Sequence, residues 1–212
     1  NGTLAYIPGN AGVNNQSLAK VDQRGEITLY TAPLQSYLEP RMSPDGTRIA
    51  VTLQSGKDAD IWVFDIPGNT LSKLTFGGVN KTAAWSPDGK KIAAGSSAGI
   101  ELLDAHTAAG DSLLSIQDAA SWVCFSPDGS QIVCSALRGS KIDPSMNKID
   151  ASTGHSSLII GDSVRTGPVA WSAGDKIAYV YSRDSTSALA LINSDGSGFS
   201  ILDTLSLFSA LS

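Results

Sequence analysis

The sequence predicts an all-β protein: a five-bladed propeller of four-stranded antiparallel sheets, closed into a single ring. Three observations support this fold class. A turn motif recurs at nearly even spacing, each copy carries the same order of short alternating strands, and the two ends of the chain complement each other. Period-two alternation with turn signals at close intervals leaves almost no room for helix.

The repeated turn motif is Ser-Pro-Asp-Gly, at residues 43–46, 86–89 and 126–129, followed by a degenerate Ser-Ala-Gly-Asp copy at residues 172–175. Successive copies start 43, 40 and 46 residues apart. One propeller blade takes about 40–45 residues, so each copy marks one blade. Proline presets φ and glycine accepts a positive φ, so the motif closes a tight hairpin between the first two strands of each blade.

The runs around each motif supply the four strands of a blade. An apolar run such as Ala83–Trp85 precedes the turn, and an alternating run such as Lys91–Ser96 follows it. A third run, as in Asp60–Asp65, leads to a turn and a short fourth run, as in Leu71–Thr75. Strands that alternate in this way are typical of sheets with two differently packed faces.

The two ends of the chain predict how the ring closes. Asn1–Ile7 parallels Asp45–Val51, so the chain opens at a second strand, while Leu205–Ser212 is an apolar run left over after the fifth blade. We expect this C-terminal strand to complete the first blade, because closure removes the unpaired edges of an open array. The predicted blades of this single domain (1–212) are residues 1–36 with 205–212, 37–78, 79–118, 119–163 and 164–204. Because the chain starts at Asn1 without an initiator Met, we expect a trimmed or excised mature domain.

Composition limits the classes of partner. The chain has 212 residues and a formal net charge of −5, which argues against nucleic acid as the main partner. No run approaches the roughly 20 apolar residues that span a bilayer, so no membrane insertion is expected. Cys124 and Cys134 lie in apolar runs and are predicted to be buried thiols, with a diagonal disulfide left open as the alternative. We expect a monomer.

The repeats also resemble a known family. Residues 83–93 (AAWSPDGKKIA) resemble the repeat of TolB-type, WD40-like propellers. Residues 40–51, with Asp60–Asp65 and Leu71–Phe76, are similar to repeats in the extracytoplasmic propellers of bacterial receptor-type serine/threonine kinases. The resemblance covers nearly the whole chain, and it implies a periplasmic or extracellular domain that serves as a protein-binding module, a sensor or a peptidase gate. It implies no catalytic residue, since one propeller scaffold hosts many activities. TolB-type propellers usually have six blades, whereas this sequence predicts five and a narrower axial channel.

No catalytic residue is assigned. Gly95–Gly99 fits G-x-S-x-G, but that motif works only where Ser97 sits on a strand-to-helix turn. His106 and His155 follow third strands and are predicted to be solvated turn residues on the face opposite Ser97. An aspartate also ends each third strand, at Asp22, Asp65, Asp104 and Asp150, where it is expected to accept hydrogen bonds from its own turn.

The face opposite the Ser-Pro-Asp-Gly turns is the predicted functional face. It collects the loops between second and third strands and the loops that cross from blade to blade. Predicted binding residues are Glu39, Lys81 and Arg165, where crossing loops enter the innermost strands, and Arg138, Lys141 and Asp143 in the insertion 135–147. Predicted metal ligands are Asp118, Asp162 and Asp203, each at the start of a crossing loop; Ca²⁺ prefers such oxygens. Solvated loop charges that bind nothing are the alternative.

Two functions therefore stay open. The first is a non-catalytic binding or sensor module that recognises a protein partner or a small ligand at the crossing-loop face and channel mouth. The second is a metal-assisted hydrolase of esters, lactones or phosphotriesters, in which a bound cation polarises the substrate and activates water.

Overall fold

The computed structural model describes residues 4–6, 16–77, 80–107, 110–114, 119–137, 144–161, 165–183 and 186–205. Within these ranges the chain forms strands, turns and bends and no helix, which confirms the all-β prediction. Accordingly, these ranges contain no helix with the length and apolar character needed to cross a membrane.

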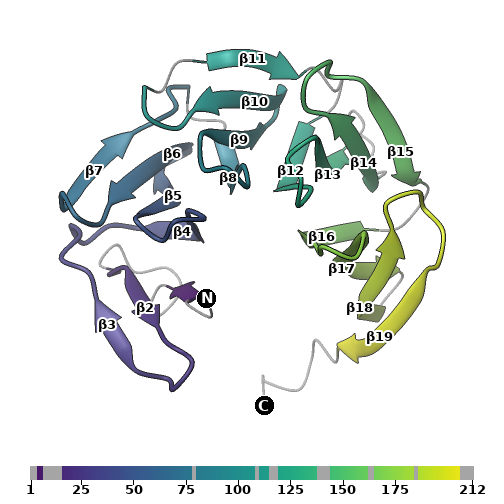
Figure 1. Ribbon diagram of the computed structural model, residues 1–212, viewed down its shortest axis with the longest axis horizontal. Helices are drawn as coiled ribbons and strands as arrows, with labels where there is room; N and C mark the ends of the chain where they lie inside the picture. The colour runs from purple at the N-terminus through teal and green to yellow at the C-terminus, as the bar shows by residue number, and fades with distance from the viewer. Residues whose placement is uncertain are drawn as a thin grey trace. The chain divides into compact units, whose positions relative to one another are not determined.

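The strands form five antiparallel sheets, and within each sheet neighbouring strands follow one another along the chain (Figure 1). The first sheet contains β1 (Leu4–Tyr6), β2 (Ala19–Val21) and β3 (Ile27–Leu29); the second contains β4 (Tyr37–Met42), β5 (Arg48–Ser55), β6 (Asp58–Asp65) and β7 (Thr70–Lys73). The third contains β8 (Asn80–Trp85), β9 (Lys91–Ser96), β10 (Gly99–Asp104) and β11 (Gly110–Leu114). The fourth contains β12 (Ala119–Phe125), β13 (Gln131–Leu137), β14 (Pro144–Asp150) and β15 (Ser156–Ile160); the fifth contains β16 (Arg165–Trp171), β17 (Lys176–Arg183), β18 (Thr186–Asn193) and β19 (Ser200–Leu205).

The chain forms two compact units. The first comprises residues 1–96 and 101–112, and the second comprises residues 97–100 and 113–212. In the first unit β4 lies against β1 and β8, and in the second unit β12 lies against β16. Within each unit, therefore, the first strands of successive sheets are neighbours.

The second sheet of the first unit packs apolar side chains on both of its faces. In β5, Ile49 and Val51 face the core shared with the first sheet, whereas Ala50 faces the core shared with the third, as period-two geometry requires. The buried members of the core toward the first sheet are Leu18, Ala32, Tyr37, Ile49, Val51 and Phe64. Those of the core toward the third sheet are Ala50, Ile61, Val63, Leu74, Ala83, Trp85, Ile92, Ala94, Leu103 and Ala105.

The second unit has a core of its own between the fourth and fifth sheets. Its buried members are Val133, Met146, Ile177, Tyr179, Ala190 and Ile192. Cys124 in β12 is half-buried beside this core, and Cys134 in β13 is fully buried. Both carry thiols rather than a disulfide, so the predicted thiols are confirmed, although Cys124 is less buried than predicted.

Local hydrogen bonds explain the repeated turn. In the second sheet the Ser43 hydroxyl donates to Asp45 Oδ1 at 2.6 Å and accepts from the Arg48 amide at 2.9 Å. The Gly46 amide donates to the Ser43 carbonyl at 2.9 Å, and its φ of 72° explains why glycine stands there. The copies at residues 86–89 and 126–129 repeat these contacts. In the degenerate copy, Asp175 takes the positive-φ position, at 59°.

These turns predict a loss of stability in acid. The hydrogen bond from the Ser43 hydroxyl is the largest of the contributions that lower the pKa of Asp45 from 3.8 to about 2. Because this pKa is lower in the folded state, the stabilisation is complete above pH 4 and is lost as the pH falls from about 4 toward 2. The pKa values of Asp88, Asp104, Asp128, Asp150 and Asp195 are lowered in the same direction. We expect the melting temperature to fall across this window, by a modest amount for each turn because these carboxylates are exposed to solvent. The slope of unfolding free energy against pH should be shallower in Asp45→Asn, and an unchanged slope would contradict this assignment.

The predicted closure of the ring involves segments outside the described residues. These segments are residues 1–3 and 206–212, which include most of the expected C-terminal strand. Closure, the count of five blades and the assignment of the whole chain to one domain therefore stay predictions. The described part of the first sheet has three strands, which is the number expected without the closing strand.

Candidate functional site

The first strand of each four-stranded sheet contains a β-bulge near the crossing loop that leads into it. The pairing register shifts between Leu38 and Arg41 in β4, Asn80 and Thr82 in β8, Ser121 and Cys124 in β12, and Thr166 and Val169 in β16. A bulge leaves one extra residue outside the ladder and changes the direction in which side chains point. The four bulges therefore mark one recurring position where the scaffold can direct a side chain toward a ligand.

Glu39, a predicted binding residue, lies in the bulge of β4. Its φ is 50°, a left-handed conformation that residues with a Cβ seldom adopt. Its carboxylate accepts a hydrogen bond from Arg41 Nη2 at 2.9 Å, with 29% of the Glu39 side chain and 43% of the Arg41 side chain exposed. An ion pair this exposed adds little stability. Either side chain can therefore leave the pair and contact a partner at small cost in folding free energy.

The other predicted binding residues are only partly described. Lys81 is the bulge residue of β8 and Arg165 is the first residue of β16; the structure describes their backbone. Arg138, Lys141 and Asp143 lie outside the described residues, as do the predicted metal ligands Asp118 and Asp162.

The predicted position of Asp203 is wrong. It lies inside β19, opposite Leu189, rather than at the start of a crossing loop, because β19 pairs with β18 as far as Leu205. Its side chain is exposed. In the part of the chain that the structure describes, no three His, Cys, Asp or Glu side chains are grouped to hold a metal ion, so the calcium site stays a prediction.

A hollow of about 600 Å³ opens at the crossing-loop end of the second sheet. Gln35 and Ser36 of the crossing loop form one side, and Ser55 and Gly56 of the β5–β6 turn form another. Asp60, Trp62 and Lys73 line it from β6 and β7. We call this the crossing-loop hollow.

A buried carboxylate provides the charge inside this hollow. The Asp60 side chain is 9% exposed and lies 2.9 Å from Lys73 Nζ. The Thr75 hydroxyl donates to Asp60 Oδ1 at 3.0 Å and accepts from the Ile61 amide at 2.9 Å. These bonds hold the carboxylate in one orientation, and a buried charge fixed in this way is a strong determinant of what can bind beside it.

Two aromatic rings extend the site along Lys73. Lys73 Nζ lies 5.9 Å from the ring centroid of Trp62 and 5.2 Å from that of Phe76. Phe76 is 76% exposed, the most exposed of the large apolar side chains described. The hollow contains polar hydrogen-bonding groups, an ion pair and the Trp62 ring, and the exposed Phe76 ring, the other aromatic contact of Lys73, lies outside it. Together these groups have the composition of a recognition site.

The residues considered for catalysis lie in ordinary turns. Ser97 is in the turn between β9 and β10, which leads into a strand rather than a helix. His106 and His155 are exposed in turns, as predicted. The aspartates that end the third strands accept hydrogen bonds from backbone amides of their turns, as predicted, at Asp22, Asp65, Asp104 and Asp150.

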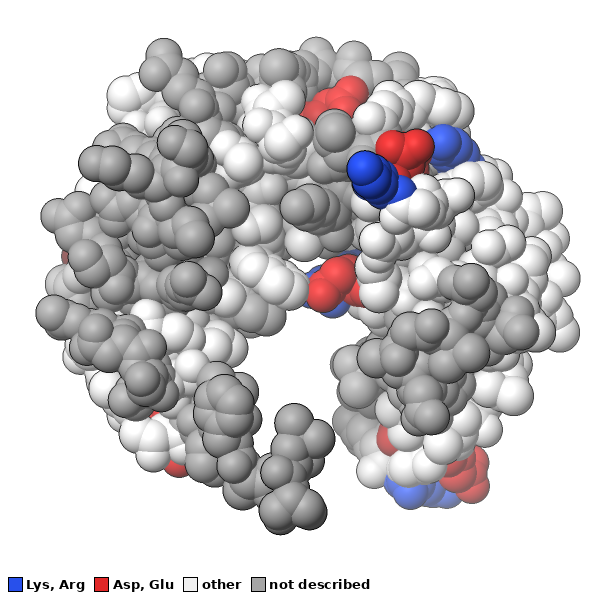
Figure 2. Space-filling model, turned by 180° about the vertical axis from the view of Figure 1, so that it is seen from behind, with Lys and Arg blue, Asp and Glu red and all other residues white. Residues whose placement is uncertain are grey.

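Figure 2 shows one face of the molecule, with the charged side chains of the described residues coloured. Among the coloured residues, acidic and basic side chains lie beside one another, with uncharged surface between these clusters.

The family model of the TolB β-propeller domain matches residues 3–208 of this chain. The chain belongs to this family. Among solved structures, TolB from Acinetobacter baumannii has a TM-score of 0.80 and 24% identity, covering 97% of this chain and 54% of its own length. The TolB protein from Agrobacterium tumefaciens also has a TM-score of 0.80, with 17% identity, 95% of this chain covered and 77% of its own.

A third solved structure of this fold is an enzyme. An oligogalacturonate lyase in complex with manganese has a TM-score of 0.63 and 15% identity, covering 96% of this TolB-type chain and 60% of its own. At these identities the likeness shows the fold alone. The chain spans about half the length of the Acinetobacter TolB. No curated protein matches the sequence.

Asp60, Trp62 and Lys73 were not among the site residues predicted from the sequence. One signal for them is present in this TolB-type repeat. Trp62 occupies the third-strand position held by Glu101 in β10, Asn147 in β14 and Ala190 in β18. A large aromatic residue at a position where these other copies carry smaller or polar residues indicates a local function rather than a requirement of the fold.

Proposed function

We propose that this TolB-type domain is a binding or sensor module that recognises a protein partner or a small ligand through its crossing-loop face. The observation that carries this proposal is the crossing-loop hollow, which places an oriented ion pair and the Trp62 ring beside a crossing loop, with the Phe76 ring also in contact with Lys73. Propeller scaffolds carry binding sites on loops at one end of the strands, so the location supports the function as well as the chemistry does.

The chemistry of the hollow favours an occupant with both a polar and an apolar part. Phe76 offers the exposed aromatic surface that anchors protein partners. The side-chain amide of Gln35 and the hydroxyls of Ser36 and Ser55 offer hydrogen bonds. Lys73 and Asp60 present opposite charges 2.9 Å apart. This arrangement favours a partner group that both donates and accepts hydrogen bonds. A peptide backbone with a neighbouring apolar side chain has these properties.

The remaining assignments on this face are part of the same proposal. Glu39, Lys81 and Arg165, with Arg138, Lys141 and Asp143, are the proposed further contacts. The family resemblance supports an extracytoplasmic location and a protein partner, and the domain is proposed to act as a monomer. No nucleic acid and no inserted membrane segment enter this function.

Site-specific photo-crosslinking tests which end of the sheet meets the partner. We expect a photoreactive residue at Ser55 or Gln35 to form one discrete adduct in the host's extract. The same residue at Lys90, in the exposed turn at the opposite end of the third sheet, should form none. Trp62→Ala should reduce the Ser55 adduct at least fivefold with an unchanged circular dichroism spectrum. Equal adducts at Ser55 and Lys90 would contradict the proposal.

A metal-assisted hydrolase of esters, lactones or phosphotriesters is the alternative function. The structural likeness to a lyase in complex with manganese is the observation in its favour. The proposed ligands are Asp118 and Asp162, and the proposed cation is Ca²⁺. Hydrolysis of activated esters that stops on chelation and in Asp162→Asn would establish this function in place of the first. Metal-free protein without turnover would end it.

A further inference from the structure

An arginine side chain fills the space between the turns of the second and third sheets. The Arg48 guanidinium lies 4.7 Å from the ring centroid of Trp85, the residue that precedes the turn at residues 86–89. Arg48 Nη1 donates to the Ala105 carbonyl at 2.7 Å, and Nη2 donates to the Gly89 carbonyl at 3.1 Å. Trp85 is only 9% exposed under this cover.

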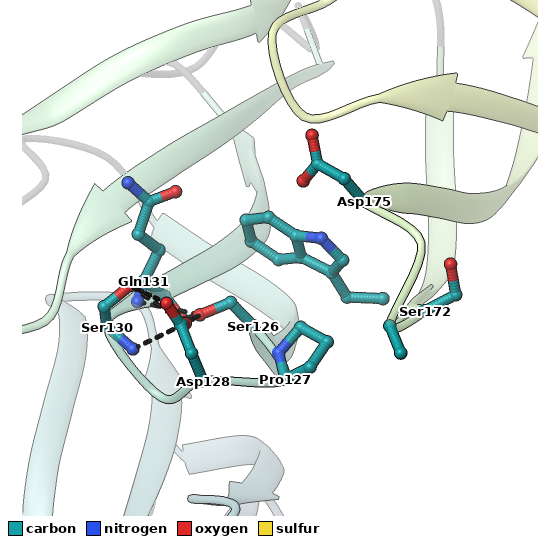
Figure 3. A pocket seen from close by; sticks show the side chains of 9 residues that line it. Ser126, Pro127, Asp128, Ser130, Gln131, Ser172 and Asp175 are labelled. Carbon is teal, nitrogen blue, oxygen red and sulfur yellow. Dashed lines mark hydrogen bonds between the residues drawn. The ribbon is translucent and has the colours of Figure 1, made fainter.

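The second unit repeats the tryptophan but not the arginine. Trp171 precedes the turn at residues 172–175, as Trp85 precedes its own turn, and the position of Arg48 is taken by Gln131. A hollow of about 330 Å³ opens between these two turns (Figure 3). Trp171 is more exposed than Trp85, because no guanidinium covers it. We call this the Trp171 hollow.

Two carboxylates line this hollow, and no arginine accompanies them. Asp128 corresponds to Asp45, and Asp175 stands where the other turns have glycine. Figure 3 shows Gln131 and Asp175 on opposite sides of the hollow, with Asp128 held by Ser126 and Ser130. None of the described residues that line the hollow is basic.

The acceptors of this hollow differ from those around Arg48. Lys148 Nζ donates to the Ser194 carbonyl at 3.0 Å. The Ser194 carbonyl is the counterpart of the Ala105 carbonyl, which accepts from Arg48 in the first unit. The Asp175 carboxylate accepts one hydrogen bond, from the Ser194 hydroxyl at 2.9 Å, and a carboxylate has further lone pairs. A guest would therefore meet an aromatic face, two carboxylates and the Gln131 amide oxygen.

We propose that the Trp171 hollow binds a guanidinium group, supplied by an arginine side chain of a partner protein. A planar guanidinium can stack face to face on an aromatic ring while its N–H groups donate in their own plane to carboxylates, and Arg is the more frequent partner in such stacks. Arg48 on Trp85 shows that the turn geometry of this chain accepts a guanidinium. The site lies at the turn end of the strands, opposite the crossing loops, so it is independent of the proposed crossing-loop site.

Titration of the full chain with N-acetyl-arginine methylamide, followed through the indole N–H signals in NMR, tests this proposal. We expect saturable binding that shifts the Trp171 signal. The affinity of the neutral citrulline analogue should be at least tenfold weaker than that of the arginine probe. Trp171→Ala and Asp175→Asn should each weaken binding at least fivefold. Equal binding of the arginine and citrulline probes, or an unchanged affinity in Trp171→Ala, would overturn the site.

A second pair of variants separates occupancy from misfolding. Gln131→Arg should fill the hollow from within, as Arg48 does, and abolish probe binding while raising the melting temperature. His155→Arg adds the same charge on an exposed turn outside the hollow and should leave binding unchanged. Full binding by a folded Gln131→Arg variant would contradict the proposal. If free arginine binds tenfold more tightly than N-acetyl-arginine methylamide, the occupant is a small guanidinium metabolite rather than an arginine side chain of a partner protein, and the proposal of a partner side chain is wrong.

Discussion

Replacing Trp85 with alanine is expected to lower the free energy of unfolding by about 4 kcal/mol, as large buried aromatic truncations do. The indole packs in the core between the second and third sheets, and its N–H donates to the Arg41 carbonyl of β4 at 2.9 Å. Its outer face carries the Arg48 guanidinium, which would lose its stacking surface. One side chain thus joins two sheets by packing, a hydrogen bond and a cation–π contact.

Two variants make this expectation specific, with urea denaturation as the measurement. Trp85→Phe keeps an aromatic ring but loses the hydrogen bond to Arg41, so it should cost about 1 kcal/mol. Trp171→Ala removes the corresponding residue of the fifth sheet, which is less buried and has no covering arginine, and should cost about 1–2 kcal/mol. Equal losses for Trp85→Ala and Trp171→Ala would show that the Arg48 contact adds nothing.

Thr75→Val is expected to destabilise the protein by about 2–3 kcal/mol, although the two side chains have nearly the same shape. Thr75 is 3% exposed, and its hydroxyl links the Ile61 amide to the Asp60 carboxylate. Valine would leave the Ile61 amide without this acceptor and remove one donor from a buried charge. The cost of leaving such groups unsatisfied exceeds the net value of the hydrogen bonds themselves.

Thr75→Ser is the matched control, because it keeps the hydroxyl and removes one methyl group. It should cost about 1 kcal/mol, close to the value of one buried methylene. The same variants report on function: Thr75→Val should also weaken binding at the crossing-loop hollow, since Asp60 would lose its fixed orientation. A valine variant as stable as the serine variant would show that the hydroxyl is not the linking group.

Features set by neighbours in the sequence were predictable. The Ser-Pro-Asp-Gly turns and the aspartates after the third strands form hydrogen bonds within a few residues, so their role follows from local chemistry alone. The strand order followed from the period-two runs for the same reason. Asp203 was misplaced because the end of β19 depends on pairing with β18, which local composition does not reveal.

The sites depend on contacts between residues that are distant in the sequence, and these were not predictable. Asp60 ends a polar stretch of sequence, yet it is buried because Lys73 and Thr75, 13 and 15 residues further on, fold over it. Likewise, Gln131 and Trp171 are ordinary residues of their own repeats. Only the packing of one blade on the next turns the exchange of arginine for glutamine into an open hollow.

The bulges in the first strands have an evolutionary consequence. Each copy holds one residue at the bulge, such as Glu39, Lys81 or Trp122, that is excluded from the ladder and so tolerates replacement. An acid and an aromatic occupy the same place in two copies of the framework, and a base lies one residue earlier in a third. Duplicated blades can thereby diverge in specificity one at a time while the architecture that they inherited stays intact.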